Sequence, residues 1–357
     1  MIGSRPTGVA GELASLCPSC GSEVARRLPS CPVCGWLVHG AELERLAREA
    51  QEAQDAGDLT TALQRWRRAL ELLPPASRQF QQIRAHLEEL SRRVDAGGSA
   101  PAKNAAERPP WLRGGGALGG LGLLVWKAKW LALLVLSKGK LLLLGLTKGT
   151  TLLSMLLAAG VYWSLWGWKF ALGFVLAIYV HEMGHVVALQ RLGIRASAPM
   201  FLPGVGAFVR LGQYPTSARE DARVGLAGPI WGLGAVLVAY ALYLGTGATS
   251  LAAIARFSAW VNLFNLLPVW QLDGSRGFRA LGRGQRLAVA GAMALMLLAT
   301  REGLLVLLGL AAGARALFEV APAQSDRPAF ASFLMLVVAL SLLAVVEVPG
   351  LPVAHQP

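Results

Sequence analysis

The stretch Phe170-Ala-Leu-Gly-Phe-Val-Leu-Ala-Ile-Tyr-Val-His-Glu-Met-Gly-His185 places an H-E-x-x-H motif at the end of an apolar run. Side chains four residues apart share one face of a helix, so His181 and His185 can direct ring nitrogens at one metal ion. Glu182 between them is the residue type that acts as a general base beside zinc. The stretch therefore predicts a membrane helix that carries a zinc hydrolase site.

The chain as a whole has the composition of an integral membrane protein. Its 357 residues are 54% hydrophobic and 15% charged, with a mean hydropathy of +0.48, and the long uncharged runs lie within residues 117–348. The net charge of +13 could indicate a nucleic-acid partner. Much of this excess lies in loops between apolar segments, where the positive-inside rule explains it, so we expect no nucleic-acid binding.

The four cysteines lie in the polar N-terminal third, in two C-x2-C pairs: Cys17, Cys20, Cys31 and Cys34. Four thiolates at this spacing are typical of a structural zinc ion with a closed tetrahedral shell. Two disulfides in an exported domain are the alternative, and the lack of a signal-peptide pattern at the start of this sequence disfavours them. We therefore expect a zinc ribbon over residues 1–40, with His39 outside the ligand set.

Residues 41–96 have a helical pattern with a turn at Ala56-Gly-Asp-Leu59, and resemble a single tetratricopeptide repeat followed by a third helix. Two interpretations stay open: a helical hairpin that packs on the zinc ribbon, and a cytosolic surface through which residues 1–96 bind a protein partner. Residues 97–116 have linker composition. Residues 117–148 contain lysines between short leucine-rich stretches, which favours an interfacial or partly inserted segment.

Residues 149–348 are expected to form a polytopic helical bundle, followed by a tail at 349–357. The expected spans are 149–166, 168–190, 224–245, 251–268, one or two within 287–318, and 328–347. Arginines gather in the loops 191–223 and 276–286, which places both loops in the cytosol together with the N-terminus. The expected location is a bacterial cytoplasmic membrane.

A catalytic zinc site needs a third protein ligand and an open position for water. Asp273 is the best candidate, because a carboxylate at the end of an apolar segment is costly unless it is paired or bound to a metal. The alternative is an ordinary cap of a short helix that follows it. Between the motifs, residues 198–210 contain prolines and glycines and predict a short β-rich loop, either a surface hairpin or a strand edge that could pair with an extended substrate.

Three motifs in this order resemble the site-2 protease family of intramembrane zinc metalloproteases, over about residues 168–282. They are His181-Glu-Met-Gly-His185, Glu220-Asp-Ala-Arg-Val-Gly-Leu-Ala-Gly-Pro229, and Asn265-Leu-Leu-Pro268 continuing to Leu272-Asp-Gly274. The resemblance implies that His181, His185 and Asp273 bind the catalytic zinc, that Glu182 is the catalytic acid and base, and that Asn265 helps to hold the substrate backbone. Two departures are Gly232, where many members have asparagine, and Ser275, where many have glycine.

The sequence thus predicts a mostly α-helical membrane protein, preceded by a small cytosolic zinc ribbon and helical hairpin, with one catalytic and one structural zinc. The predicted function is hydrolysis of peptide bonds in or near transmembrane segments of membrane proteins. The alternative is a catalytically inactive membrane scaffold that recruits partners through the zinc ribbon and helical repeat. Glu182 favours the protease, because a scaffold needs no general base.

Overall fold

The computed structural model describes residues 14–95, 149–202, 206–209, 213–322 and 325–350. The expected linker at 97–116 and the interfacial segment at 117–148 lie outside the described residues. The chain folds into two compact units: one contains the N-terminal elements, and the other contains the helices from residue 149 onward. The units are described separately.

The N-terminal unit begins with an antiparallel pair of short strands, β1 (Ala14–Leu16) and β2 (Glu23–Ala25). Three helices follow: α1 (Gly40–Asp55), α2 (Leu59–Glu71) and α3 (Arg78–Asp95). The Asp58 carboxylate caps α2 by accepting a hydrogen bond from the Thr61 backbone N–H. Leu59, Leu63, Leu87 and Leu90 form the buried contact between α2 and α3.

The larger unit is a helical bundle with one β-hairpin. Its helices are α5 (Gly149–Trp166), α6 (Trp168–Arg191), α7 (Ala218–Thr246), α8 (Thr249–Asn265), α9 (Asp273–Arg279), α10 (Arg283–Thr300), α11 (Leu304–Phe318) and α12 (Arg327–Ala344). The hairpin joins β3 (Met200–Leu202) to β4 (Gly206–Phe208). The mostly helical fold with a short β-rich loop is the one that the sequence predicted.

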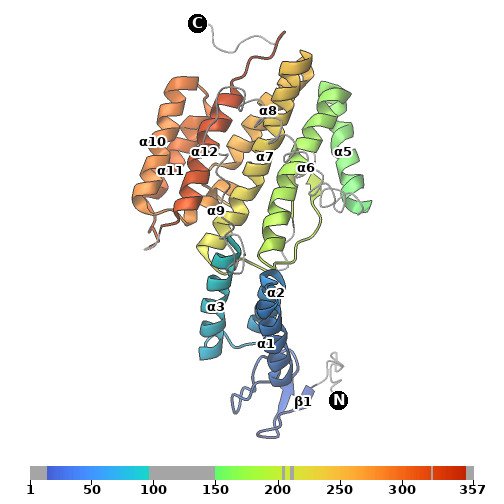
Figure 1. The fold of residues 1–357 in the computed structure, drawn as a ribbon, viewed down its shortest axis with the longest axis vertical. Helices are drawn as coiled ribbons and strands as arrows, with labels where there is room; N and C mark the ends of the chain where they lie inside the picture. Colours follow the sequence, from blue (N-terminus) through green and yellow to red (C-terminus); the bar gives the residue numbers. More distant parts are fainter. Residues whose placement is uncertain (1–13, 96–148, 203–205, 210–212, 323–324, 351–357) are drawn as a thin grey trace, which may run out of the picture. The chain divides into compact units, whose positions relative to one another are not determined.

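Apolar residues divide the larger unit into two buried clusters. One cluster joins α7, α8, α9, α10, α11 and α12, with Phe278 and Phe333 fully buried in it. The other joins α5, α6 and β3 through residues such as Tyr162, Phe174 and Phe201. Figure 1 shows α7 and α8 in the middle of this unit, with α6 and α5 on one side and α10, α11 and α12 on the other.

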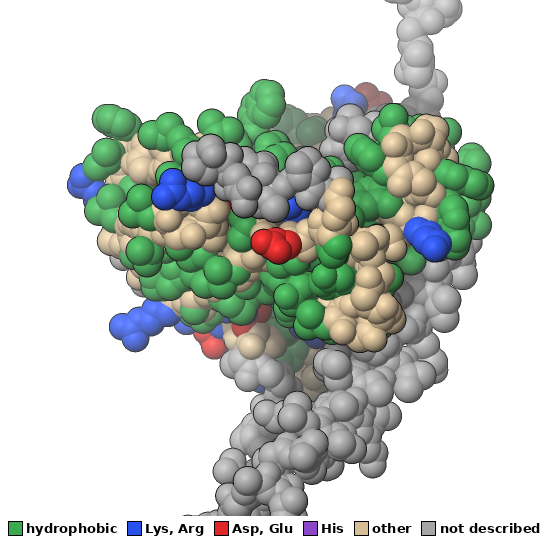
Figure 2. All heavy atoms as spheres, turned by 90° about the horizontal axis from the view of Figure 1, so that it is seen from above, with side chains coloured by type: hydrophobic (Ala, Val, Ile, Leu, Met, Phe, Trp, Pro, Cys, Tyr) green, Lys and Arg blue, Asp and Glu red, His purple; other side chains and the backbone are tan. Residues whose placement is uncertain are grey.

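Four of the described helices are long and apolar enough to cross a membrane: α5, α6, α7 and α12. The expected spans at 251–268 and 287–318 correspond to α8, α10 and α11, which are helices but do not meet the same limits of length and hydropathy. The outer face of α5 exposes Leu153, Leu156 and Leu157 by 60–70%. Hydrophobic side chains also cover much of the described surface on the face seen in Figure 2. Such a surface suits a bilayer, so the protein is an integral membrane protein.

Candidate functional site

The H-E-x-x-H motif lies in the buried part of α6, and both histidines have their Nδ1 atoms occupied by oxygen acceptors. His181 Nδ1 lies 2.8 Å from Asn262 Oδ1, and His185 Nδ1 lies 2.8 Å from the Val224 carbonyl oxygen. A carbonyl oxygen can only accept, so each Nδ1 carries the proton. The two Nε2 atoms are therefore unprotonated in the neutral rings, and they lie 3.2 Å apart. This is the form in which imidazole binds a metal.

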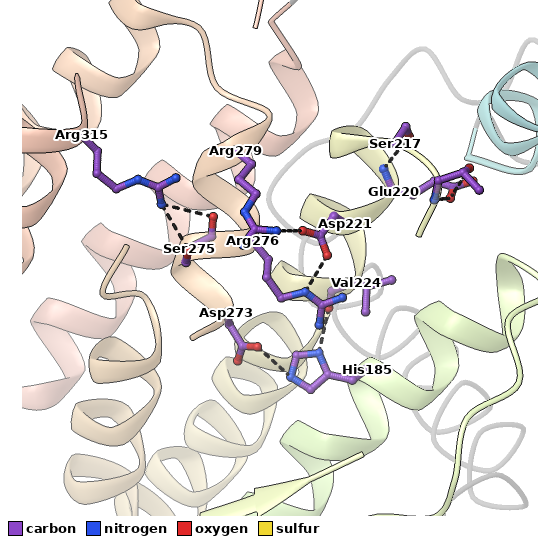
Figure 3. Close-up of polar contacts among 11 residues, drawn as sticks. His185, Ser217, Glu220, Asp221, Val224, Asp273, Ser275, Arg276, Arg279 and Arg315 are labelled. Carbon is purple, nitrogen blue, oxygen red and sulfur yellow. Dashed lines mark hydrogen bonds and ion pairs between the residues drawn. The ribbon is translucent and has the colours of Figure 1, made fainter. Parts of the chain in front are cut away.

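Asp273 completes the cluster from the first residue of α9. One of its carboxylate oxygens lies 3.0 Å from His181 Nε2, and the other lies 3.3 Å from His185 Nε2. Figure 3 shows His185 between Asp273 and Val224. The residue at the cap position of α9 is Leu272, and no side chain forms a cap hydrogen bond there. The Asp273 carboxylate is thus directed at the histidines instead of capping its helix.

The distances among these atoms fit a zinc ion. Zinc–nitrogen bonds of 2.0–2.1 Å in a tetrahedral shell separate neighbouring ligand atoms by about 3.3 Å. The three separations in the cluster are 3.0, 3.2 and 3.3 Å. Three protein ligands leave the fourth tetrahedral position open, as catalytic zinc sites require. The three side chains form one of two groups in the described residues that could hold a metal ion.

Glu182 lies next to His181 on α6 and is only 7% exposed. A buried carboxylate is unfavourable for folding unless it is paired or bound to a metal. Its position beside two histidines that could hold a metal ion favours a chemical role over a structural one.

Three glycines on one face of α7 let the elements of the site approach one another. A methyl group on Gly228 would lie 2.2 Å from His185 Nε2, and one on Gly225 would lie 2.9 Å from the Asp273 carbonyl oxygen. A methyl group on Gly232 would lie 2.0 Å from Asn262 Oδ1. Gly234, by contrast, faces open space. Gly225, Gly228 and Gly232 of α7 thus border the site.

Ion pairs and hydrogen bonds fix α9, and with it Asp273. Asp221 in the first turn of α7 pairs with Arg276 at 2.7 Å and with Arg279 at 3.0 Å, as Figure 3 shows. Arg315 of α11 donates to the side-chain and backbone oxygens of Ser275. Ser275, which stands where many members of the family have glycine, is 4% exposed. Its contacts with Arg315 hold the first turn of α9.

Two asparagines, Asn262 and Asn265, lie in the last four residues of α8. Asn265, predicted to hold the substrate backbone, is half-buried at the last residue of α8 and does not belong to the candidate metal group of His181, His185 and Asp273, so its role stays a prediction. Asn262, which the sequence reasoning missed, contacts His181 directly. The available signal was a second amide in an otherwise apolar helix, which is costly unless it has hydrogen-bond partners.

The four cysteines lie together in the N-terminal unit. Cys17 Sγ lies 3.6 Å from Cys34 Sγ, and Cys20 Sγ lies 3.6 Å from Cys31 Sγ. All four are free thiols, and these separations are close to the roughly 3.8 Å expected for sulfurs that share a tetrahedral zinc. Hydrogen bonds with the side chain and backbone of Ser22 lower the pKa of the Cys20 thiol to about 6, which favours the metal-binding thiolate. The residues therefore fit a zinc ribbon and not a disulfide pair.

The chain was compared with known protein families and curated proteins. Residues 169–251 match the sequence model of peptidase family M50. No curated protein is similar enough to the chain to give a match. The matched segment contains α6 with its H-E-x-x-H motif, the β3–β4 hairpin, and α7 with the glycines that border the histidines. Over residues 169–251 the chain is therefore similar to peptidase family M50, the site-2 protease family, and this segment holds two of the helices that are long and apolar enough to cross a membrane.

Proposed function

We propose that this protein is an intramembrane zinc metalloprotease that hydrolyses peptide bonds in or near transmembrane segments of membrane proteins. The observation that supports it most is the convergence of three metal-binding side chains beside a buried glutamate. His181 and His185 present unprotonated Nε2 atoms, Asp273 presents its carboxylate, and Glu182 lies next to His181. Zinc held there would polarise the scissile carbonyl and lower the pKa of a bound water.

Glu182 then acts as general base and general acid. It accepts a proton from the attacking water and returns that proton to the leaving amine as the C–N bond breaks. The Asn265 side chain, at the last residue of α8, helps to hold the substrate backbone.

Substrate must be extended before cleavage, because a helix keeps its peptide groups in internal hydrogen bonds. The β3–β4 hairpin could bind the extended form by strand addition. The Phe201 N–H of β3 donates to Ser154 of α5, so one edge of β3 already faces α5. Among the described strands β4 pairs only with β3, so its other edge is the better candidate for pairing with substrate.

The cysteine cluster supports a structural zinc in the N-terminal unit, which gives about two zinc ions per chain. We place residues 1–96 and the loop 191–223 on the cytosolic side of a bacterial membrane, where residues 1–96 could bind a cytosolic partner. Cysteine introduced at Ser22 and at Ser217 should be labelled from the same side of the membrane. Labelling from opposite sides would contradict this orientation.

The decisive variant is Glu182→Gln. Glutamine is nearly isosteric but cannot accept the water proton at neutral pH, so cleavage should fall by about 10²–10⁴-fold or more while zinc content stays unchanged. Asp273→Ala should instead lower zinc content, because it removes a ligand. Substrates can be found as membrane-protein fragments that differ between cells with wild-type and Glu182→Gln protein.

Wild-type cleavage of such a substrate by purified, zinc-loaded Glu182→Gln protein would contradict the proposed mechanism. If neither wild type nor variant cleaves any membrane protein while both bind zinc, the inactive scaffold is the better description.

A further inference from the structure

Asn262 is a buried amide in α8 that joins two helices at the metal site. It is 5% exposed, its Oδ1 lies 2.8 Å from His181 Nδ1, and its Nδ2 donates to the Ser258 carbonyl oxygen at 2.8 Å. We propose that Asn262 is a positioning residue: it holds His181 with Nδ1 protonated and Nε2 directed at the metal. This inference concerns the metal site of the proposed function and deepens it.

The orientation of the amide follows from its surroundings. The Ser258 carbonyl oxygen can only accept, so it requires the NH2 group of Asn262 on its side. The oxygen of the amide must then face His181, and this oxygen can only accept a hydrogen bond, so Nδ1 carries the proton. The backbone of α8 thereby selects the tautomer of a histidine on α6. A ligand histidine in the other tautomer would present a proton to the metal and could not bind it.

The two histidines reach the same state by different means. His185 donates to a backbone oxygen, that of Val224 on α7, which no substitution of Val224 removes. His181 depends on a single side chain, so its orientation can be tested by mutation. In a buried setting the loss of Asn262 would also leave the His181 Nδ1 proton without its acceptor, which raises the cost of the metal-binding tautomer.

Gly232 of α7 provides the space that the amide occupies. A Cβ at residue 232 would lie 2.0 Å from Asn262 Oδ1, 2.6 Å from Cγ and 2.8 Å from Nδ2. These are its three nearest atoms, and all belong to the amide. A side chain at 232 would therefore displace Asn262 before it touched anything else. The glycine on α7 and the asparagine on α8 act as one unit that sets the direction of His181.

The test is the zinc affinity of the full-length protein, measured by competition with a chelator after both sites are loaded. Asn262→Ala should weaken binding at the histidine site by about 10–100-fold, the usual effect of removing a hydrogen-bond partner of a ligand histidine. Asn262→Leu should weaken it equally, because leucine restores the volume but not the acceptor. Gly232→Ala should also weaken it, because it displaces the amide.

The decisive measurement is a double-mutant cycle. In the Asn262→Ala background the three atoms nearest to residue 232 are gone, so Gly232→Ala should weaken zinc binding no further. Gly234→Ala on the same helix should leave affinity unchanged, and Asn265→Ala should lower cleavage but not affinity. Wild-type zinc affinity in the Asn262 variants would overturn the assignment. So would a double variant whose loss of zinc affinity equals the product of the losses in the two single variants.

The readout separates this inference from the proposed function. Zinc affinity does not depend on cleavage, so it tests Asn262 even if neither wild type nor Glu182→Gln cleaves a membrane protein. Conversely, an inactive Glu182→Gln variant together with unchanged affinity in Asn262→Ala would leave the protease intact and remove only the positioning role.

Discussion

Gly228→Ala should damage the metal site more than any other single methyl group added on α7. The new Cβ would lie 2.2 Å from His185 Nε2, 2.5 Å from His185 Cε1 and 2.7 Å from His181 Nε2. Ordinary contact between such atoms requires about 3.5 Å, so a ring must move by about 1 Å. Neither ring is free to do so, because each Nδ1 is hydrogen-bonded at 2.8 Å.

The size of the effect follows from that displacement. A misplacement of 1 Å at a catalytic site typically costs about 10²-fold in rate, and displaced ligand atoms also weaken metal binding. We expect cleavage to fall by at least that factor, with a measurable loss of zinc at the histidine site. The N-terminal zinc should remain, because the cysteines lie in a separate unit.

Gly234→Ala is the matched control. It adds the same methyl group to the same helix, where nothing lies within 4 Å. Alanine favours a helix over glycine by roughly 1 kcal/mol in peptide hosts, so the control should not be less stable than wild type. The assays are zinc content of purified protein and cleavage of a reconstituted substrate. Equal zinc content and equal rates in Gly228→Ala and Gly234→Ala would refute the predicted geometry of the site.

Three further predictions concern other parts of the chain. Replacing Cys17 and Cys20 by serine should remove one zinc per chain and leave the histidine site loaded, as metal analysis would show; loss of both zinc ions would contradict two independent sites. Asp221→Asn should lower zinc affinity and lower the free energy of unfolding by about 1–3 kcal/mol, because it breaks the contacts with two arginines that hold α9; unchanged values in chelator competition and thermal unfolding would argue against this clamp. Asp58→Ala should destabilise α2 by about 1 kcal/mol, measurable as faster hydrogen exchange in that helix. Hydrogen bonds from Thr61 lower the pKa of Asp58. The stabilisation of α2 by this cap is therefore present above the unfolded-state pKa and is lost as the pH falls through the lower folded-state pKa. The same pH dependence of the exchange rate of α2 in wild type and Asp58→Ala would contradict this stabilisation.

Short-range patterns were enough to predict much of this protein. His181 and His185 lie four residues apart, so the period of the helix brings them together without any tertiary contact. The paired C-x2-C spacing indicated one metal site because each pair presents two thiolates from a single turn. The helical hairpin could be recognised from the turn before Leu59, and the membrane class followed from composition.

Contacts between distant segments decided the rest. Asp273 lies far along the chain from the histidines, and its local sequence is compatible both with a zinc ligand and with a helix cap. The packing of α9 against α7 directs the Asp273 carboxylate to the Nε2 atoms of both histidines. In the same way, the sequence alone did not single out Asn262, which the tertiary structure brings to His181. Helical periodicity fixes which residues share a face, but only the packing of one helix on another determines what that face meets.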